Sequence, residues 1–263
     1  MLEFQGAQPT WSRRRTSRTV ALRETHVLGN AEQKLGAERT SGVPSGLAVW
    51  HWSTRDIAPR DRVASWHEVH AKAIARRRIS VFSDEFGDVD VRLARVGVAG
   101  RQIGLQRMRL TDGSIATRER ALLNDGSDDV ILHVQLRGAR ELAQMGRTAF
   151  VPAGAAVYSF NAEPSTIRLP AGSDFVSIAL PHTLISARVP RIEDAVARPL
   201  ASNHPTLRLL FAYLASMDLR PERCDALLGQ MIASHLLDLA SHLAGSLLHE
   251  ELDESGEGLR AAR

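Results

Sequence analysis

The histidines of the first third of the chain are the residues whose type and spacing could hold a metal ion. His67 and His70 stand three positions apart in a segment of helical periodicity, so both imidazoles lie near one face, and His51 offers a third nitrogen. A zinc site needs three or four protein ligands, and no carboxylate or cysteine completes a convincing set. We therefore expect an exposed His67, a His70 that packs against its helix, and no metal.

A second histidine series, His235, His242 and His249, recurs every seven residues. Seven residues of α-helix span roughly 10 Å, so neighbouring members cannot share one ion. We expect these side chains beside a seam between helices, where they could respond to pH across a dimer.

His133 and Gln135 form the polar pair that we expect to contact a ligand. They alternate with apolar residues in the segment VILHVQLR, which is typical of a strand, and one face of each strand in a small barrel points into the cavity. The alternative is that the apolar face lines the cavity and the polar pair points to solvent or to a helical layer.

Aromatic side chains are the other candidates for ligand contact. Tyr158, Phe160 and Trp52 could stack on an aromatic molecule, and Trp50 shares the strand face of Trp52. The alternative for each is ordinary packing.

Catalytic motifs are missing from the sequence. It has no G-x-S-x-G elbow and no phosphate-binding loop, and Cys224 lies in an amphipathic segment where an inert thiol is expected. We expect no catalytic residues, no metal and no cofactor, and hence a protein that is not an enzyme.

The elements that position these residues are short strands separated by glycines and turn pairs. This spacing predicts an all-β sandwich or barrel. The expected strands cover residues 89–97, 103–110, 115–123, 130–137, 140–145, 147–151, 156–160, 166–169 and 174–180.

Helical periodicity is found before and after the strands. It predicts helices at 59–78, 182–187, 205–217 and 221–250, the second-last and last of them with proline in the first turn. The last helix has an apolar stripe that must be buried, and we expect it to pack against a second copy of the chain. Its members are Leu228, Ile232, Leu236, Leu239 and Leu243.

Composition excludes several protein classes. The net charge is +3 with a pI of about 9.6, but residues 1–78 are basic and 218–263 acidic, which argues against one continuous nucleic-acid surface. No apolar run of membrane-spanning length and no signal peptide is evident, so we expect a cytoplasmic protein that does not contact a membrane. Residues 1–45 are read as a disordered basic leader.

The turn motif near residue 150 resembles the second motif of cupin barrels. Gly146, five further residues and then Pro152-Ala-Gly154 are followed by Asn161, which the cupin motif also has. The cupin motif has a metal-binding histidine where this chain has Val157, and valine has no lone pair to donate. The resemblance implies a barrel that encloses a ligand without a metal.

A longer series of motifs resembles the effector-binding and dimerisation domain of AraC/XylS-type transcription regulators, in the AraC-binding-like branch. The match runs from about Trp50 to Leu247. Its parts are Trp66, Thr117-Arg118, Leu136-Arg137-Gly138, Gln144 to Arg147, Pro152 to Gly154, Leu180-Pro181, and Leu184 with Arg188 and Pro190. Two positions depart from the family pattern, Ala155 in place of an acid and Ser165 in place of an aromatic residue.

The resemblance implies an α+β, mainly β fold: a cupin-like jelly-roll β-barrel preceded by one helix and followed by an antiparallel pair of helices. It implies a small-molecule effector, a homodimer, and DNA contact only through a missing or separate helix-turn-helix domain. We divide the chain into the leader (1–45), a sensor barrel with its helix (46–181), a helical dimerisation region (182–250) and an acidic linker (251–263). The alternatives are a cupin-type metal-dependent enzyme and a truncated, non-functional remnant.

Overall fold

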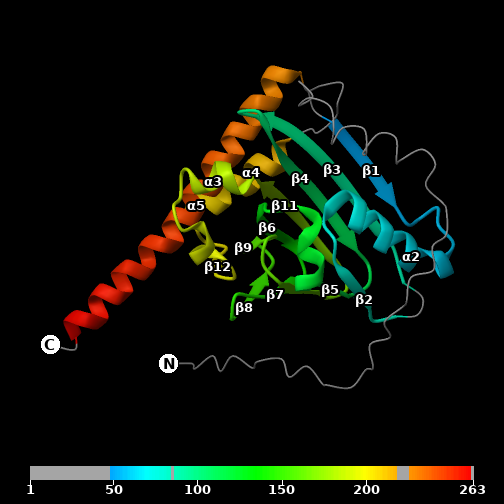
Figure 1. The fold of residues 1–263 in the computed structure, drawn as a ribbon, viewed down its shortest axis with the longest axis horizontal. Helices are drawn as coiled ribbons and strands as arrows, with labels where there is room; N and C mark the ends of the chain where they lie inside the picture. Colours follow the sequence, from blue (N-terminus) through cyan, green and yellow to red (C-terminus); the bar gives the residue numbers. More distant parts are fainter. Residues whose placement is uncertain (1–47, 84–85, 218–224, 262–263) are drawn as a thin grey trace, which may run out of the picture.

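A computed structural model (Figure 1) describes residues 48–83, 86–217 and 225–261. The expected leader, residues 1–45, and Cys224 lie outside the described residues.

Two antiparallel sheets face each other and form the jelly-roll barrel. The seven-stranded sheet has the order β1 (Ala48–Ser53), β3 (Val89–Val98), β4 (Arg101–Leu110), β11 (Ser173–Leu180), β6 (Val130–Arg137), β9 (Ala156–Phe160) and β12 (Pro199–Leu200). The five-stranded sheet has the order β2 (Arg78–Val81), β5 (Ser114–Arg118), β10 (Ser165–Leu169), β7 (Ala139–Gln144) and β8 (Arg147–Pro152). The predicted fold class is thus confirmed.

Turn chemistry sets the register of the hairpin between β7 and β8. Met145 and Gly146 both have positive φ, 50° and 74°, and Gln144 pairs with Arg147 across the turn. Two central residues with positive φ give a turn whose twist matches that of the strands. Gly154, with φ of 86°, then carries the chain from β8 into β9.

The helix predicted at 59–78 is shorter than expected. The helix α2 (Pro59–Val69) is followed by one π-helical turn, His70–Ile74, and the chain becomes extended at Ala75. Residues 78–81 then form β2, because this segment pairs with β5 at the edge of the smaller sheet. Likewise the strand predicted at 115–123 ends at Arg118 and is followed by a 3₁₀ helix, Arg120–Asp125.

The helices that follow the barrel are α3 (His182–Ser186), α4 (Pro205–Ser216) and α5 (Ala226–Ala261). Hydrogen bonds join Tyr213 to His235, Thr206 to His242 and His204 to Ser246. The partner number on α5 falls as the number on α4 rises, so the two helices are antiparallel. His235 and His242 lie at this seam, as their spacing predicted.

The helix α5 crosses the outer face of the larger sheet and extends beyond the barrel at its C-terminal end (Figure 1). It is helical through the residues expected to form a linker, which contain no proline and several glutamates, and glutamate favours helix. The segment Ala226–His249 is long and apolar enough to cross a membrane, which the sequence analysis did not anticipate. The core helix of a globular fold meets the same criteria, and here Leu236, Ala240 and Leu243 are buried.

Candidate ligand-binding site

A cavity of about 1000 Å³ lies between the two sheets. The larger sheet contributes Gln106, Met108, Ile131, His133, Phe175 and Ser177, and the smaller sheet contributes Ser114, Ala116, Arg140, Ile167 and Leu169. Trp66, the π turn and residues 124–129 also line the cavity. This volume is ample for a small organic molecule.

The strand β6 has both faces buried. His133 and Ile131 line the cavity, while Leu132 pairs with Tyr158 of β9, whose hydroxyl donates to the carbonyl of Ala240 in α5 at 2.6 Å. The apolar face of β6 therefore packs under the helices, and the polar face lines the cavity. Periodicity alone left these two arrangements open.

His133 is held by two serine hydroxyls. Its Nδ1 lies 2.8 Å from the Oγ of Ser177 and its Nε2 lies 2.9 Å from the Oγ of Ser159. Burial lowers the pKa of His133 well below its usual range, and the positive charges of Arg140 and Arg77 add to this effect. The imidazole is thus neutral at physiological pH, donates through one nitrogen and accepts at the other.

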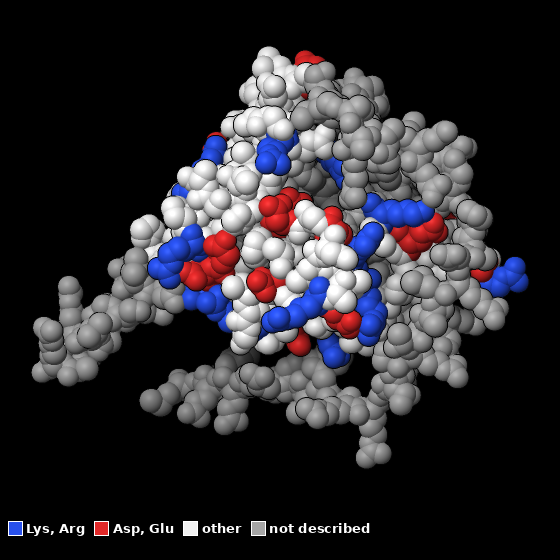
Figure 2. Space-filling view, viewed as in Figure 1, with Lys and Arg blue, Asp and Glu red and all other residues white. Residues whose placement is uncertain are grey.

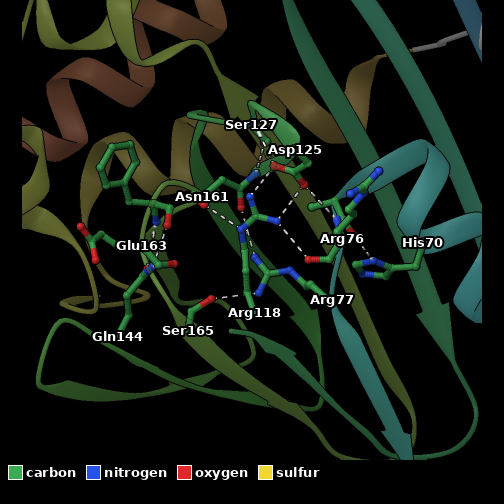
Figure 3. Close-up of polar contacts among 12 residues, drawn as sticks. His70, Arg76, Arg77, Arg118, Asp125, Ser127, Gln144, Asn161, Glu163 and Ser165 are labelled. Carbon is green, nitrogen blue, oxygen red and sulfur yellow. Dashed lines mark hydrogen bonds and ion pairs between the residues drawn. The ribbon is translucent and has the colours of Figure 1, made fainter. Parts of the chain in front are cut away.

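Arg118 joins three segments that line the cavity, at Arg76, Asp125 and Asn161 (Figure 3). Its side chain is fully buried, and two of its nitrogens bind the carboxylate of Asp125 at 2.7 and 2.9 Å. It also donates to the carbonyl oxygens of Asn161 and Arg76, at 2.7 and 3.0 Å. Burial raises the pKa of Asp125, but the hydrogen bonds with Arg118 and two backbone N–H groups outweigh this and bring it to about 2.

Neighbouring contacts extend this network. Arg77 donates to Ser165 at 2.9 Å and to the side-chain oxygen of Asn161 at 3.2 Å, and burial lowers its pKa to about 10. Gln144 donates to the carbonyls of Phe160 and Glu163 and accepts from the N–H of Phe160, so it fixes the turn between β9 and β10 (Figure 3).

The side chain of Arg147 contacts the backbone of the segment between α3 and β12. Its Nη1 donates to the carbonyl oxygens of Asp194 and Val196, each at 3.0 Å, and not to a carboxylate.

Arg140 is one of the polar groups of the cavity that the sequence analysis did not predict. It is 1% exposed, its guanidinium carbon lies 4.2 Å from the centre of the Phe175 ring, and its Nε and Nη2 have no hydrogen-bond partner. Burial, and then the charge of Arg77, lower its pKa to about 9. Alternation in β7 could have indicated that Arg140 is buried, since it places Arg140 on the same face as the buried Leu142 and Gln144.

The other four residues expected to bind a ligand do not line the cavity. Gln135 is buried and donates to the carbonyl of Arg137. Tyr158 faces α5, and Phe160 stacks on His182 with ring centres 5.1 Å apart. Trp52 stacks on Trp66 at 5.8 Å, so it supports a residue that does line the cavity.

Two of the three metal-ligand candidates are engaged in other contacts, whereas His67, which was expected to be exposed, is half-buried and its Nε2 has no hydrogen-bond partner. His51 lies 2.8 Å from Asp90, and Nδ1 of His70 donates to the carbonyl of Ala75 at 2.8 Å. Val157, at the cupin ligand position, is buried opposite His133 in the register of β6 and β9. Among the described residues no group of three His, Cys, Asp or Glu side chains could hold a metal ion.

The apolar stripe expected to form a dimer contact is divided between the core and the surface. Leu236 and Leu243 are fully buried and Ile232 is nearly so, Leu239 is half-buried, and Leu228 is 41% exposed. The barrel of the same chain therefore covers much of this stripe.

Charged residues of both signs are interspersed over the described part of the face in Figure 2. This face has no continuous basic surface of the kind that binds nucleic acid.

Comparisons with known proteins place the chain in a family. The sequence model of the AraC-binding-like domain matches residues 66–244, while a search of curated proteins gives no match. The crystal structure of the AraC-like transcriptional activator CuxR is similar in fold, with a TM-score of 0.62 and 16% identity over 74% of this chain and 70% of that chain.

Two further structures are similar to a smaller part of the chain. They are a putative ethanolamine utilization protein Q from Salmonella typhimurium LT2 (TM-score 0.27, 15% identity, 35% of this chain and 69% of that chain) and the cupin domain of an XRE family transcriptional regulator from Enterobacter cloacae (TM-score 0.25, 17% identity, 30% and 81%). Matches of this size add nothing to the fold argument, whereas the match to the domain family spans well over half of the chain. The chain belongs to the AraC-binding-like domain family.

Proposed function

We propose that this chain is the sensing and dimerisation part of an AraC-type transcription regulator, which responds to a small molecule bound between its sheets. The family supports a regulatory role, and the cavity of about 1000 Å³ supports ligand binding. DNA is contacted only indirectly, through a helix-turn-helix part that is separate from residues 1–263. The protein acts in the cytoplasm, without a membrane contact or a catalysed reaction.

One observation carries this proposal: the strand β9 contacts both the cavity wall and α5. Ser159 binds the cavity-lining His133 at 2.9 Å, while the preceding Tyr158 donates to Ala240 of α5 at 2.6 Å. A ligand that displaces His133 or Ser159 would shift the strand that carries Tyr158. The bound state would then favour one position of α5, and a dimer would pass this bias on to its DNA-binding part.

A thermal-shift screen of the purified chain against a panel of small metabolites tests the proposal. We expect at least one compound to raise the melting temperature, because a ligand that binds only the folded state stabilises it. Elemental analysis of the same sample addresses the rival, a cupin-type metal enzyme. Stoichiometric iron, zinc or manganese would contradict our proposal, as would a complete panel without any stabilising compound.

The exposed end of α5 supports a dimer contact. Three apolar side chains near the N-terminal end of α5 are exposed: Leu227 by 68%, Leu228 by 41% and Met231 by 48%. The apolar residues farther along α5 are instead buried against the barrel. We expect Met231→Glu combined with Leu228→Glu to convert a dimer into a monomer, because two carboxylates would be desolvated in the contact. Sedimentation equilibrium measures the change.

Phe150→Glu is the matched control, since Phe150 is 59% exposed on β8 of the smaller sheet. It should leave the dimer intact. A double variant of α5 with an unchanged dimerisation constant would exclude this part of the helix from the contact. The buried Leu236 and Leu243 are unsuitable for this test, because their substitution would mainly unfold the chain.

A further inference from the structure

Arg140 is a buried cation whose hydrogen-bonding groups are partly unused. It is 1% exposed, it lines the cavity, and neither its Nε nor its Nη2 has a partner. A buried charge is normally paired and hydrogen-bonded, since transfer out of water is otherwise very costly. No Asp or Glu forms an ion pair with Arg140 within the part of the chain that the structure describes.

The two unpartnered nitrogens belong to one edge of the guanidinium. Nε–H and one N–H of Nη2 point the same way, and this edge binds the two oxygens of a carboxylate through parallel hydrogen bonds. The chain contains an example of this geometry: Arg107 holds Asp174 with Nε to Oδ1 at 3.2 Å and Nη2 to Oδ2 at 2.9 Å. The same edge of Arg140 is buried and has no carboxylate in front of it, so a ligand reaches it by displacing the side chains that cover it.

The surroundings of Arg140 favour an anion over a neutral polar group. Arg77 lies close enough to lower the pKa of Arg140, so the charge next to it is positive. Three aspartates line the cavity: Asp125 is engaged by Arg118, and among the described contacts neither Asp128 nor Asp129 forms an ion pair with Arg140. Apolar side chains form part of the cavity wall, with Phe175 against the guanidinium and with Met108, Ile167 and Leu169 also on the cavity.

We propose that the effector is a small organic acid whose carboxylate binds the Nε and Nη2 edge of Arg140, with its apolar body in the cavity between the sheets. The inference rests on the proposed function and adds the chemical class of the ligand. Arg140 also positions the ligand, because a two-point contact fixes both distance and orientation. His133 lies on the opposite sheet, and because Ser177 and Ser159 engage both of its ring nitrogens, a ligand can bind the imidazole only by displacing one of these hydroxyls.

Binding experiments with matched acids and amides test the assignment. The probes are hexanoate, octanoate and 3-phenylpropanoate, each beside its primary amide, with inorganic phosphate and sulfate as further arms. We expect at least one acid to raise the melting temperature of the wild-type chain and its amide to have no effect. Arg140→Met should weaken binding of that acid roughly 30-fold or more, the loss typical of removing one partner of a buried charged pair.

Arg140→Lys separates the two-point contact from simple charge attraction. Lysine keeps the charge but lacks the planar edge, so affinity for the acid should fall in this variant also. Full binding by Arg140→Lys would overturn the two-point contact, and binding of phosphate or sulfate in place of all the acids would overturn the carboxylate. If acids and amides bind equally and Arg140→Met binds both, the carboxylate assignment fails while the cavity remains a ligand site. If neither binds, the assignment fails and the sensing function loses its support.

A stability measurement tests the same assignment without any ligand. If Arg140 is kept for binding, its unpaired charge destabilises the free protein, and Arg140→Met should raise the melting temperature by at least about 2 °C. A fall in the melting temperature would show that Arg140 serves the fold through its contact with Phe175, and this outcome would overturn the proposal.

Discussion

Arg118→Met will lower the free energy of unfolding by about 3–5 kcal/mol, the usual cost of removing one partner of a buried ion pair. The guanidinium of Arg118 is fully buried and donates to Asp125, to the carbonyl of Asn161 and to the carbonyl of Arg76. Its loss leaves the two carbonyls without this donor. Asp125, with only 12% of its side chain exposed, keeps two backbone N–H donors but loses its ion-pair partner. Urea unfolding of the wild-type chain and the variant at pH 7 measures the difference.

Arg78→Met is the control for this substitution. Arg78 pairs with Glu119 at 3.0 Å, but the two side chains are 54% and 40% exposed, so the expected loss is only about 0–1 kcal/mol. The double variant Arg118→Met with Asp125→Asn should recover part of the loss, because it removes the unpaired charge. Equal effects of Arg118→Met and Arg78→Met would contradict the role of Arg118 in joining these segments that line the cavity.

The contacts of Arg118 and Gln144 give a physical reason for two motifs that carried the family resemblance. The Thr117-Arg118 pair places a guanidinium where it joins the 3₁₀ helix, the end of β9 and the backbone that enters β2. Gln144 fixes the turn after β9 with three hydrogen bonds (Figure 3). Both residues thus hold the frame around the cavity, and neither is left free to bind a ligand.

The sequence predicted the strands best where alternation and turn residues agreed. β6 and β9 have the predicted bounds, because each is bounded by turn residues and β6 also alternates clearly. β1 and β2 were missed because both are edge strands, whose form depends on pairing with β3 and β5 far along the chain. The helix predicted at 59–78 is longer than the observed helix for the same reason, since residues 78–81 pair with β5 and belong to the sheet.

The ligand-binding residues were harder to predict than the fold. Alternation separates the two faces of a strand but does not tell which face meets the cavity and which meets a covering helix. In β9 the cavity side holds Ser159 and Val157, whereas Tyr158 meets α5, and only the position of α5 decides this. Arg140 escaped notice because an arginine in a strand is ordinarily taken to be exposed.

Lowering the pH from 6.5 to 5 will reduce the free energy of unfolding by about 3 kcal/mol through two buried histidines, at up to about 1.4 kcal/mol per pH unit for each. Burial lowers the pKa of His133 well below its usual range and that of His70 to about 3, and nearby arginine charges act in the same direction. Both therefore bind protons less readily in the folded chain than in the unfolded chain, where each binds a proton below about pH 6.5. The unfolded state therefore binds more protons, and stability falls as the pH falls.

His133→Gln should remove about half of this pH dependence, since glutamine keeps hydrogen-bonding capacity toward Ser159 and Ser177 but does not titrate. The exposed His249 provides the control, and His249→Gln should leave the slope unchanged.

The pKa of Asp125 is lowered to about 2, so its stabilising effect is lost only between about pH 4 and 2 and does not overlap this window. Urea unfolding at pH 6.5, 5.75 and 5 measures the slope, and an equal slope in His133→Gln and the wild-type chain would mean that His133 is protonated in the fold. A charged imidazole beside Arg140 and Arg77 would repel a third cation and attract an anion more strongly, so the same measurement bears on how the cavity recognises its ligand.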